Sequence, residues 1–170
     1  MKSAASILNI RHLSCYAHSL NLVVQNAIGK SIKPVVDDVK MIVQYFRKSS
    51  SALSKLSEMQ KTLNKATVKL KQDVPTRWNS TFDMLDRVLL NKEPIISNLA
   101  LLDSKLALES SAWEVIEKSV NLLKVFNEVT VEISSENNVS LSKTFVFYWI
   151  MLRKMCSFQD EVLPQCAKML

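Results

Sequence analysis

The stretch PVVDDVKMIVQYF, residues 34–46, decides the fold class of this chain. Its apolar residues recur every three or four positions, the spacing of one helix face: Val35, Val36, Val39, Ile42, Val43 and Phe46. Proline suits the first turn of a helix, because the N–H that it lacks would have no partner there. Two aspartates come early, and Arg47 and Lys48 come late, as the helix dipole favours. The stretch therefore predicts an amphipathic helix that starts at Pro34.

Upstream, residues 16–28 predict a second helix that keeps one side apolar, with Leu20, Val23, Val24, Ala27 and Ile28. Gly29 is the single glycine of the chain. We expect it to cap the C-terminus of this helix, because glycine adopts the left-handed conformation at low cost. Residues 10–15 could form one short strand before the helix.

Downstream, serines at residues 49–51 offer N-caps for another helix. Its apolar residues alternate spacings of three and four: Leu56, Met59, Leu63, Ala66 and Leu70. The pattern lasts barely two heptads, so a hairpin with the preceding helix is favoured over a coiled coil. In such a helix Lys61, Lys65 and Lys69 form a solvated ridge at i,i+4 spacing.

The next helix is expected just after Val74 and Pro75, because a proline pushes its predecessor out of the α region. Ser80 and Asp83 resemble a capping box. The residues that this helix should bury are Phe82, Leu85, Val88 and Leu89. Another short apolar segment covers residues 94–102.

Ser111 is placed to cap a long helix over residues 113–133. Its predicted buried residues are Val115, Ile116, Val120, Leu123, Phe126 and Val129. After a polar loop at residues 134–138, the last helix should cover residues 142–158. The aromatic and β-branched run at residues 145–150 leaves a strand open as the alternative there.

The composition agrees with an all-α fold in one domain-sized chain. The 170 residues are 48% hydrophobic, and one glycine with four prolines leaves no glycine-rich phosphate loop. No apolar run reaches the ~18 residues of a membrane span, and the first residues lack the apolar core of a signal peptide. Cys15, Cys156 and Cys166 lack CxxC spacing and fit reduced thiols. We expect an intracellular protein with no membrane contact and no small-molecule substrate.

Positive charge is concentrated in one segment. The whole chain carries +6. Between Phe46 and Arg77 two acidic residues face eight basic ones: Arg47, Lys48, Lys55, Lys61, Lys65, Lys69, Lys71 and Arg77. This local excess equals the charge of the whole chain, so a polyanionic partner is expected here.

Cys15 and His18 are the only Cys/His pair at ligand-like spacing. A zinc site needs about four ligands, and the rest of the chain offers only His12 and two distant cysteines. A buried thiol and a hydrogen-bonded imidazole that pack a helix start are favoured instead. We therefore predict no metal site and no cofactor.

Arg77 and Trp78 are the sharpest candidates for contact with nucleic acid. An indole can stack on an unpaired base while a neighbouring guanidinium holds the adjacent phosphate. The alternative, favoured by the residues alone, is that Trp78 anchors a helix junction in the core while Arg77 caps or pairs locally. Asp73 is expected to fix the loop or to pair with Arg77. Trp113 and Trp149 fall on apolar helical stripes and are predicted core residues.

Three blocks of the sequence resemble hAT-superfamily transposases and the ZBED-like genes domesticated from them. Residues 73–81, DVPTRWNST, followed by Met84, Leu85 and Arg87, resemble the family's RW signature. Residues 15–24, CYAHSLNLVV, resemble its CxxH motif, and residues 122–130, LLKVFNEVT, with Ser134 and Ser140, resemble a third block. The blocks stand in family order across nearly the whole chain.

This resemblance implies an RNase H-like core interrupted by an all-helical insertion domain. Residues 1–30 would be a remnant of that core with the CxxH helix, and residues 31–170 part of the insertion domain. Active members carry three acidic residues on the core, yet residues 1–9 contain no carboxylate where one is expected. The other two, the BED-type zinc finger and the dimerisation segment are expected outside this chain. The resemblance therefore implies no catalytic residues and no enzyme activity.

In active members the RW tryptophan lies near the transposon end, so the resemblance favours nucleic-acid contact by Arg77 and Trp78. The predicted surface adds Lys61, Lys65, Lys69 and Lys71, while Cys15, His18 and Asp73 are expected to be structural. The predicted function is weak, non-specific DNA contact by an inactive transposase-derived protein in the nucleus. The alternatives are a helical module that binds a protein partner or itself, and a remnant without function.

Overall fold

The computed structural model describes residues 15–102, 104–135 and 141–157. Within these ranges the chain forms seven α-helices and one 3₁₀ turn, and no strand. The predicted all-α fold is confirmed, whereas the strand predicted at residues 10–15 falls almost entirely outside the described residues. No described helix is both long and apolar enough to span a bilayer.

The first two helices form one side of the core. Helix α2 covers Tyr16–Ser31 and α3 covers Lys33–Lys48, with Pro34 in its first turn as predicted. The prediction that Gly29 caps α2 is wrong, because its φ is not positive and the helix continues past it. Ile32 ends the helix instead. Its side chain is buried, and its N–H bonds to the Ile28 carbonyl, so core packing carries the helical register beyond the glycine.

Helix α4 covers Ser50–Thr62 and packs on α3, which confirms a hairpin with the preceding helix. The Ser49 hydroxyl caps it by accepting the Ala52 N–H at 3.1 Å. The predicted continuation to Leu70 is wrong. Asn64 adopts φ 51°, and the N–H groups of Asn64 and Lys65 bond back to Lys61 and Gln60. This reversed end is a Schellman motif, which asparagine tolerates at its left-handed position.

An extended segment follows α4, and the buried side chain of Gln60 holds it. The Gln60 amide donates to the Val68 carbonyl at 3.0 Å and to the side chain of Asn91. Leu70 is buried, whereas Leu63 is 38% exposed. The apolar spacing at residues 56–70 therefore reflects a helix followed by an extended chain rather than one longer helix.

Helix α5 covers Trp78–Leu90, and α6 covers Lys92–Leu102. Helix α5 buries Phe82, Leu85 and Val88 as predicted. The predicted capping box is wrong, because α5 begins before Ser80 and the Asp83 carboxylate pairs with Lys71.

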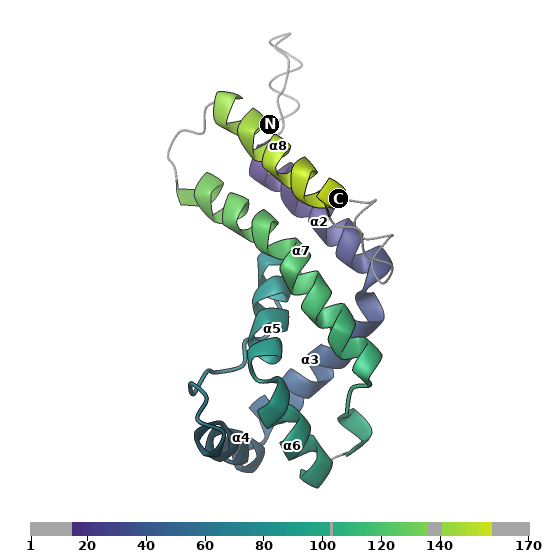
Figure 1. The fold of residues 1–170 in the computed structure, drawn as a ribbon, viewed down its shortest axis with the longest axis vertical. Coiled ribbons are helices and arrows are strands. Elements are labelled where there is room, and N and C mark those ends of the chain that lie inside the picture. Colours follow the sequence, from purple (N-terminus) through teal and green to yellow (C-terminus); the bar gives the residue numbers. More distant parts are fainter. Residues whose placement is uncertain (1–14, 103, 136–140, 158–170) are drawn as a thin grey trace.

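Helix α7, Ser110–Ser135, is the longest and packs on α2, α3, α5 and α8. The turn η1, Ser104–Leu106, precedes it, and Ser111 lies inside its first turn rather than at the predicted cap. Figure 1 shows α7 running along the molecule, with α2 and α8 at one end and α4 and α6 at the other.

Helix α8 covers Leu141–Ser157, so the helix prediction holds over the strand alternative. The two tryptophans predicted for the core differ. Trp113 is 3% exposed, as predicted, but Trp149 is 58% exposed. Helix α8 packs on α7 and buries Met151, which turns the ring of Trp149 outward.

Candidate nucleic-acid interface

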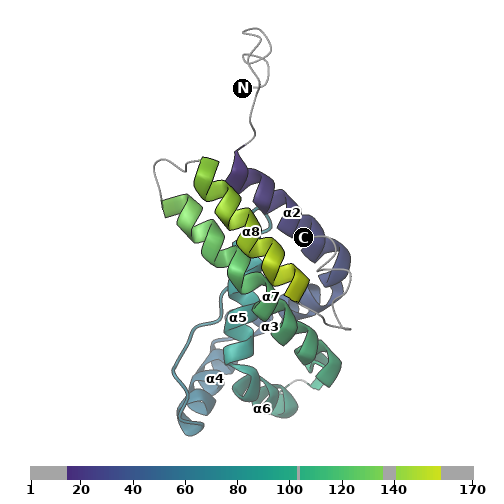
Figure 2. The same cartoon turned by 45° about the horizontal axis from the view of Figure 1, so that its top comes forward.

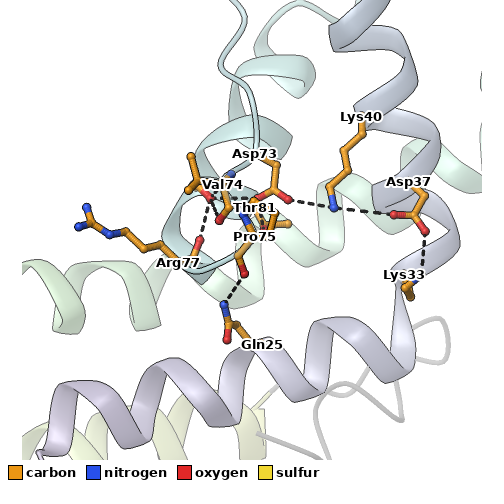
Figure 3. Close-up of polar contacts among 10 residues, drawn as sticks. Gln25, Lys33, Asp37, Lys40, Asp73, Val74, Pro75, Arg77 and Thr81 are labelled. Atoms are coloured by element: carbon orange, nitrogen blue, oxygen red, sulfur yellow. Dashed lines mark hydrogen bonds and ion pairs between the residues drawn. The ribbon is translucent and has the colours of Figure 1, made fainter.

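A buried carboxylate organises the loop before α5. The side chain of Asp73 is only 5% exposed, and its Oδ2 lies 2.9 Å from Nζ of Lys40 on α3. Its Oδ1 accepts the Thr81 hydroxyl at 2.7 Å and lies 2.9 Å from that of Ser80. Figure 3 shows these groups converging from the loop, α3 and α5. The prediction that Asp73 fixes the loop is confirmed, with Lys40 rather than Arg77 as its ionic partner.

The environment of Asp73 favours its charged form. Burial alone would raise the pKa of this carboxyl, but hydrogen bonds from Lys40, Thr81 and Ser80 and the positive charge of Lys40 outweigh it. The pKa of Asp73 is therefore lowered from its ordinary value. An ionised, buried carboxylate that is bonded to three groups from the loop's neighbours stabilises the junction.

The same loop is also fastened to α2. Gln25 donates to the Pro75 carbonyl at 2.9 Å, and the Trp78 N–H donates to the Asn21 side chain at 3.2 Å. These bonds link residues 50 and 57 positions apart in the chain. Together with the Lys40 pair from α3, they make the junction join α2, α3 and α5. The start of α5 is thereby held at a fixed position against α2 and α3.

Trp78 is part of this junction and not of the surface. Its ring is 1% exposed and packs against Phe82, with ring centroids 6.3 Å apart. A buried indole leaves no face on which a base can stack. The hypothesis that Trp78 stacks on nucleic acid is therefore wrong for this fold, and the core alternative describes it. The sequence pattern indicated this burial, because Trp78 continues the apolar stripe of α5.

Arg77 is exposed, whereas its neighbour Trp78 is buried. It occupies the N-cap position of α5, and its side chain makes no capping hydrogen bond. Its guanidinium extends away from the Asp73 network in Figure 3. Among the described residues no carboxylate pairs with it, so the predicted local pairing is not observed and its charge faces solvent.

The predicted lysine ridge does not exist as a ridge. Only Lys61 lies on α4, while Lys65, Lys69 and Lys71 lie in the extended segment. Lys65 pairs with Glu93 at 2.6 Å and Lys71 with Asp83 at 2.6 Å. Because α4 ends at Thr62 and Asn64 reverses the chain, the i,i+4 spacing no longer places these side chains on one face.

Sequence reasoning passed over one cation that the fold brings close to this segment. Arg47 at the end of α3 and Lys69 line one open groove of about 330 Å³, with polar Ser57 and Gln60 between α4 and the extended segment. Figure 2 shows that segment running from α4 to the start of α5. Arg47 belongs to the charge excess of the sequence, but the predicted surface included only Arg77, Trp78 and the lysines after residue 60.

Six of the eight basic residues in this region have no carboxylate partner within the described part of the chain: Arg47, Lys48, Lys55, Lys61, Lys69 and Arg77. Lys65 and Lys71 are paired. The exposed cations extend from the end of α3 through α4 and the extended segment to the start of α5. Such a surface can attract phosphates without reading sequence.

Cys15 and His18 are both exposed at the start of α2. The prediction of a buried thiol and a hydrogen-bonded imidazole is wrong, because these positions point away from the apolar side of α2. No group of three or more His, Cys, Asp or Glu residues in the described ranges is arranged to hold a metal ion.

Comparison with known proteins agrees with the blocks seen in the sequence. The family described as the ZBED1 RNase-like helical domain matches residues 13–122. The chain is 26% identical over 153 residues to zinc finger BED domain-containing protein 4 of Homo sapiens, covering 89% of this chain and 13% of that protein. No solved structure matches significantly.

Two further relatives show the same pattern. Zinc finger BED domain-containing protein RICESLEEPER 2 of Oryza sativa subsp. japonica is 30% identical over 160 residues, 91% of this chain and 22% of that protein. Zinc finger BED domain-containing protein 6 of Homo sapiens is 30% identical over 125 residues, 72% of this chain and 13% of that protein. The chain thus spans less than a quarter of the length of these relatives. It belongs to the family of ZBED-like proteins derived from hAT transposases, in which it corresponds to the RNase-like helical domain.

Proposed function

We propose that this chain is a catalytically inactive, transposase-derived module that associates with DNA in the nucleus. The observation that carries the proposal is the run of six exposed cations from Arg47 to Arg77, none paired with a carboxylate of the described residues, on a fold of this family. The names of the relatives include a BED zinc finger, which supports a nuclear, DNA-associated setting.

The contact is with phosphates and is weak and non-specific. Lysine and arginine side chains on an extended segment neutralise phosphates and release counterions, which gives affinity without base readout. The groove that Arg47 and Lys69 share supplies two cations at one place, and Arg77 adds a third beyond the far end of the segment. The paired Lys65 and Lys71 contribute less, because Glu93 and Asp83 already neutralise them.

Trp78 takes a positioning role in this proposal. Its buried ring and the Asp73 network hold the start of α5, and Arg77 is the residue that this junction presents to solvent. Catalytic inactivity rests on the chemistry of the family reaction, which needs clustered carboxylates to hold two metal ions. The carboxylate of Asp73 is committed to Lys40, Thr81 and Ser80.

The test measures oligonucleotide binding over a salt series by fluorescence anisotropy, with single- and double-stranded DNA of unrelated sequences. We expect similar affinities across sequences. The double substitution Arg47→Ala and Lys69→Ala should flatten the plot of log K against log salt by about 0.9 for each phosphate of the duplex that is no longer neutralised. Lys30→Ala on α2 is the matched control and should leave the slope unchanged.

Two results would count against the proposal. One is the absence of binding by the parent chain even at low salt. The other is a loss of affinity in the Lys30→Ala control that equals, per charge removed, the loss in the double variant, which would make the effect one of net charge rather than of this surface. Divalent-metal-dependent cleavage of the oligonucleotides would overturn the inactivity.

A further inference from the structure

Helix α8 carries an uncovered apolar face. Five large apolar residues in two turns are exposed: Phe145 73%, Val146 54%, Tyr148 55%, Trp149 58% and Ile150 39%. Single exposed apolar residues are ordinary, but a contiguous group that includes three aromatic rings marks an interaction surface. Met151 of the same helix is buried toward α7, so α8 is apolar around much of its circumference. A helix of this kind is normally buried on more than one side.

The apolar face of α8 continues onto α2. An open groove of about 150 Å³ lies between the two helices, lined mainly by Leu20, Val23, Tyr148, Met151, Leu152 and Met155. Leu22 and Val23 on α2 are themselves 52% and 41% exposed. Figure 2 shows α2 and α8 side by side at one end of the molecule. An apolar groove between two helices accepts the apolar side of a third, and methionines adapt its walls.

The charge of this surface has one sign. Neither α2 nor α8 contains an aspartate or a glutamate. Their charged residues are Lys30, Lys143, Arg153 and Lys154. The Arg153 guanidinium lies 5.2 Å from the ring centroid of Trp149, which places a cation directly beside the aromatic patch. Complementarity therefore calls for an occupant that combines apolar anchors with carboxylates.

A second copy of the chain fits this requirement poorly. Helix α7 has exposed glutamates at positions 114, 117, 128 and 132, but its only exposed large apolar residue is Val131. If α8 paired with α8 of another copy, cations would face cations, because this helix lacks acidic residues altogether. No described helix of the chain is both strongly acidic and apolar on an exposed face.

We propose that the surface formed by α2 and α8 is the docking site for an amphipathic helix of a protein partner, with large apolar side chains on one face and carboxylates beside them. This inference does not depend on DNA association, because it uses none of the cations of the proposed DNA surface. Five of those cations lie at the end of α3, on α4 and in the extended segment, and Arg77 lies at the start of α5. Trp149 is the central anchor of the site, and Arg153 selects for acidic residues.

The test uses the full chain and two labelled helical peptides of about 20 residues, a length at which helicity is appreciable. Both carry the same leucine stripe, with glutamates beside it in one and lysines in the other. We expect the acidic peptide to bind and the basic one to bind much less. Trp149→Ser should raise the Kd for the acidic peptide about tenfold or more, as truncation of an aromatic anchor does.

Arg153→Glu should weaken the binding of the acidic peptide and strengthen the binding of the basic one, since the substitution inverts the charge beside the Trp149 ring. Leu101→Ser on α6 is the matched control. Leu101 is 78% exposed, and its helix α6 lies at the opposite end of the molecule from α8 in Figure 1, so its replacement should leave both affinities unchanged. Thermal melts should show Leu101→Ser close to the parent chain. Trp149→Ser and Arg153→Glu should melt only slightly earlier, because each replaced side chain is exposed and the lost cation–π contact is worth about 0.5–1 kcal/mol.

Four outcomes would overturn the proposal. The first is equal binding of the two peptides, and the second is no binding of either. The third is a dimer of the parent chain by light scattering that Trp149→Ser dissolves, which would assign the face to a second copy. The fourth is sedimentation with phosphatidylserine and phosphatidylcholine vesicles that depends on Trp149, which would assign it to a lipid surface. Oligonucleotide binding by the Trp149→Ser variant is measured alongside, so failure here is distinguished from failure of the DNA proposal.

Discussion

The loop before α5 and the outer face of α8 each place a tryptophan near an arginine, with opposite results. At the loop, Trp78 is 1% exposed and Arg77 projects into solvent. On α8, Trp149 is 58% exposed and Arg153 stacks beside its ring. The same pair of residue types thus gives a core anchor with a free cation in one region and an open aromatic patch in the other.

The difference lies in what surrounds each ring. Helices α2, α3 and α7 all pack on α5. Gln25 donates a hydrogen bond to the loop and Asn21 accepts one from the Trp78 N–H, and these bonds fasten the junction. Helix α8 packs mainly on α7 and leaves its far side open. A residue's place on an apolar stripe indicates which side of a helix is apolar, whereas burial depends on whether another element covers that side.

The largest expected effect comes from the two tryptophans themselves. Trp78→Ala removes a fully buried ring and should lower the free energy of unfolding by roughly 3–5 kcal/mol, including the cavity left behind. Trp149→Ala should cost only about 0.5–1 kcal/mol, the value of an exposed cation–π contact. Urea denaturation followed by circular dichroism measures both.

Similar destabilisation by the two variants would break the comparison, because it would mean that the face of α8 is covered in solution. Little effect of Trp78→Ala would show instead that the ring does not anchor the junction. Trp113→Ala is the internal standard, since Trp113 is buried like Trp78, at 3% exposed, and should behave as Trp78 does.

A smaller effect is expected at the carboxylate of the junction. Asp73→Ala leaves Lys40 and two hydroxyl groups without their shared acceptor and should cost roughly 1–3 kcal/mol. Asp83→Ala breaks the solvated pair with Lys71 and should cost about 0–1 kcal/mol. Equal costs measured by denaturation would contradict the view that only the junction pair is structural.

The pH dependence of stability sharpens the same point. The pKa of Asp73 is lowered in the folded chain, so its contribution is fully present above the ordinary value of 3.8 and is lost as the pH falls through the folded-state pKa. The uncharged variant Asp73→Asn lacks this contribution at every pH. The stability gap between the parent and Asp73→Asn should therefore narrow on acidification below the ordinary value, in denaturation curves recorded at a series of pH values. A gap that stays constant would show that Asp73 contributes by shape and not by charge.

The sequence predicted most of the helices but few of the polar contacts that fix the site. Periodic apolar residues located α3, α5 and α7, because each of these helices turns one clear apolar side to the core. The end of α4 was missed, since Asn64 at positive φ and the hydrogen bonds of Gln60 redirect a chain whose spacing still looks helical. Local spacing does not reveal such contacts between distant residues.

The sequence predicted the positive charge of the candidate site, but it did not predict how the basic side chains are arranged. The excess of cations between Phe46 and Arg77 is a property of composition and survives any change of local fold. Which lysines stay free depends on partners from other helices, such as Glu93 for Lys65. Sequence spacing alone therefore could not separate Lys69 and Arg47, which share a groove, from the neutralised Lys65.

The smallest effect on stability is expected at Arg77, and its adjacent residue Trp78 gives the closest comparison. Arg77→Ala should change the free energy of unfolding by no more than about 0.5 kcal/mol, because its side chain caps nothing and pairs with no described carboxylate. The adjacent Trp78→Ala should destabilise the chain several-fold more. If Arg77 also binds a phosphate, its removal should flatten the salt dependence of duplex DNA binding by about 0.9 without altering the melt. An Arg77→Ala protein that melts early would place this guanidinium in the junction with Trp78, and the division between buried anchor and free cation would no longer hold.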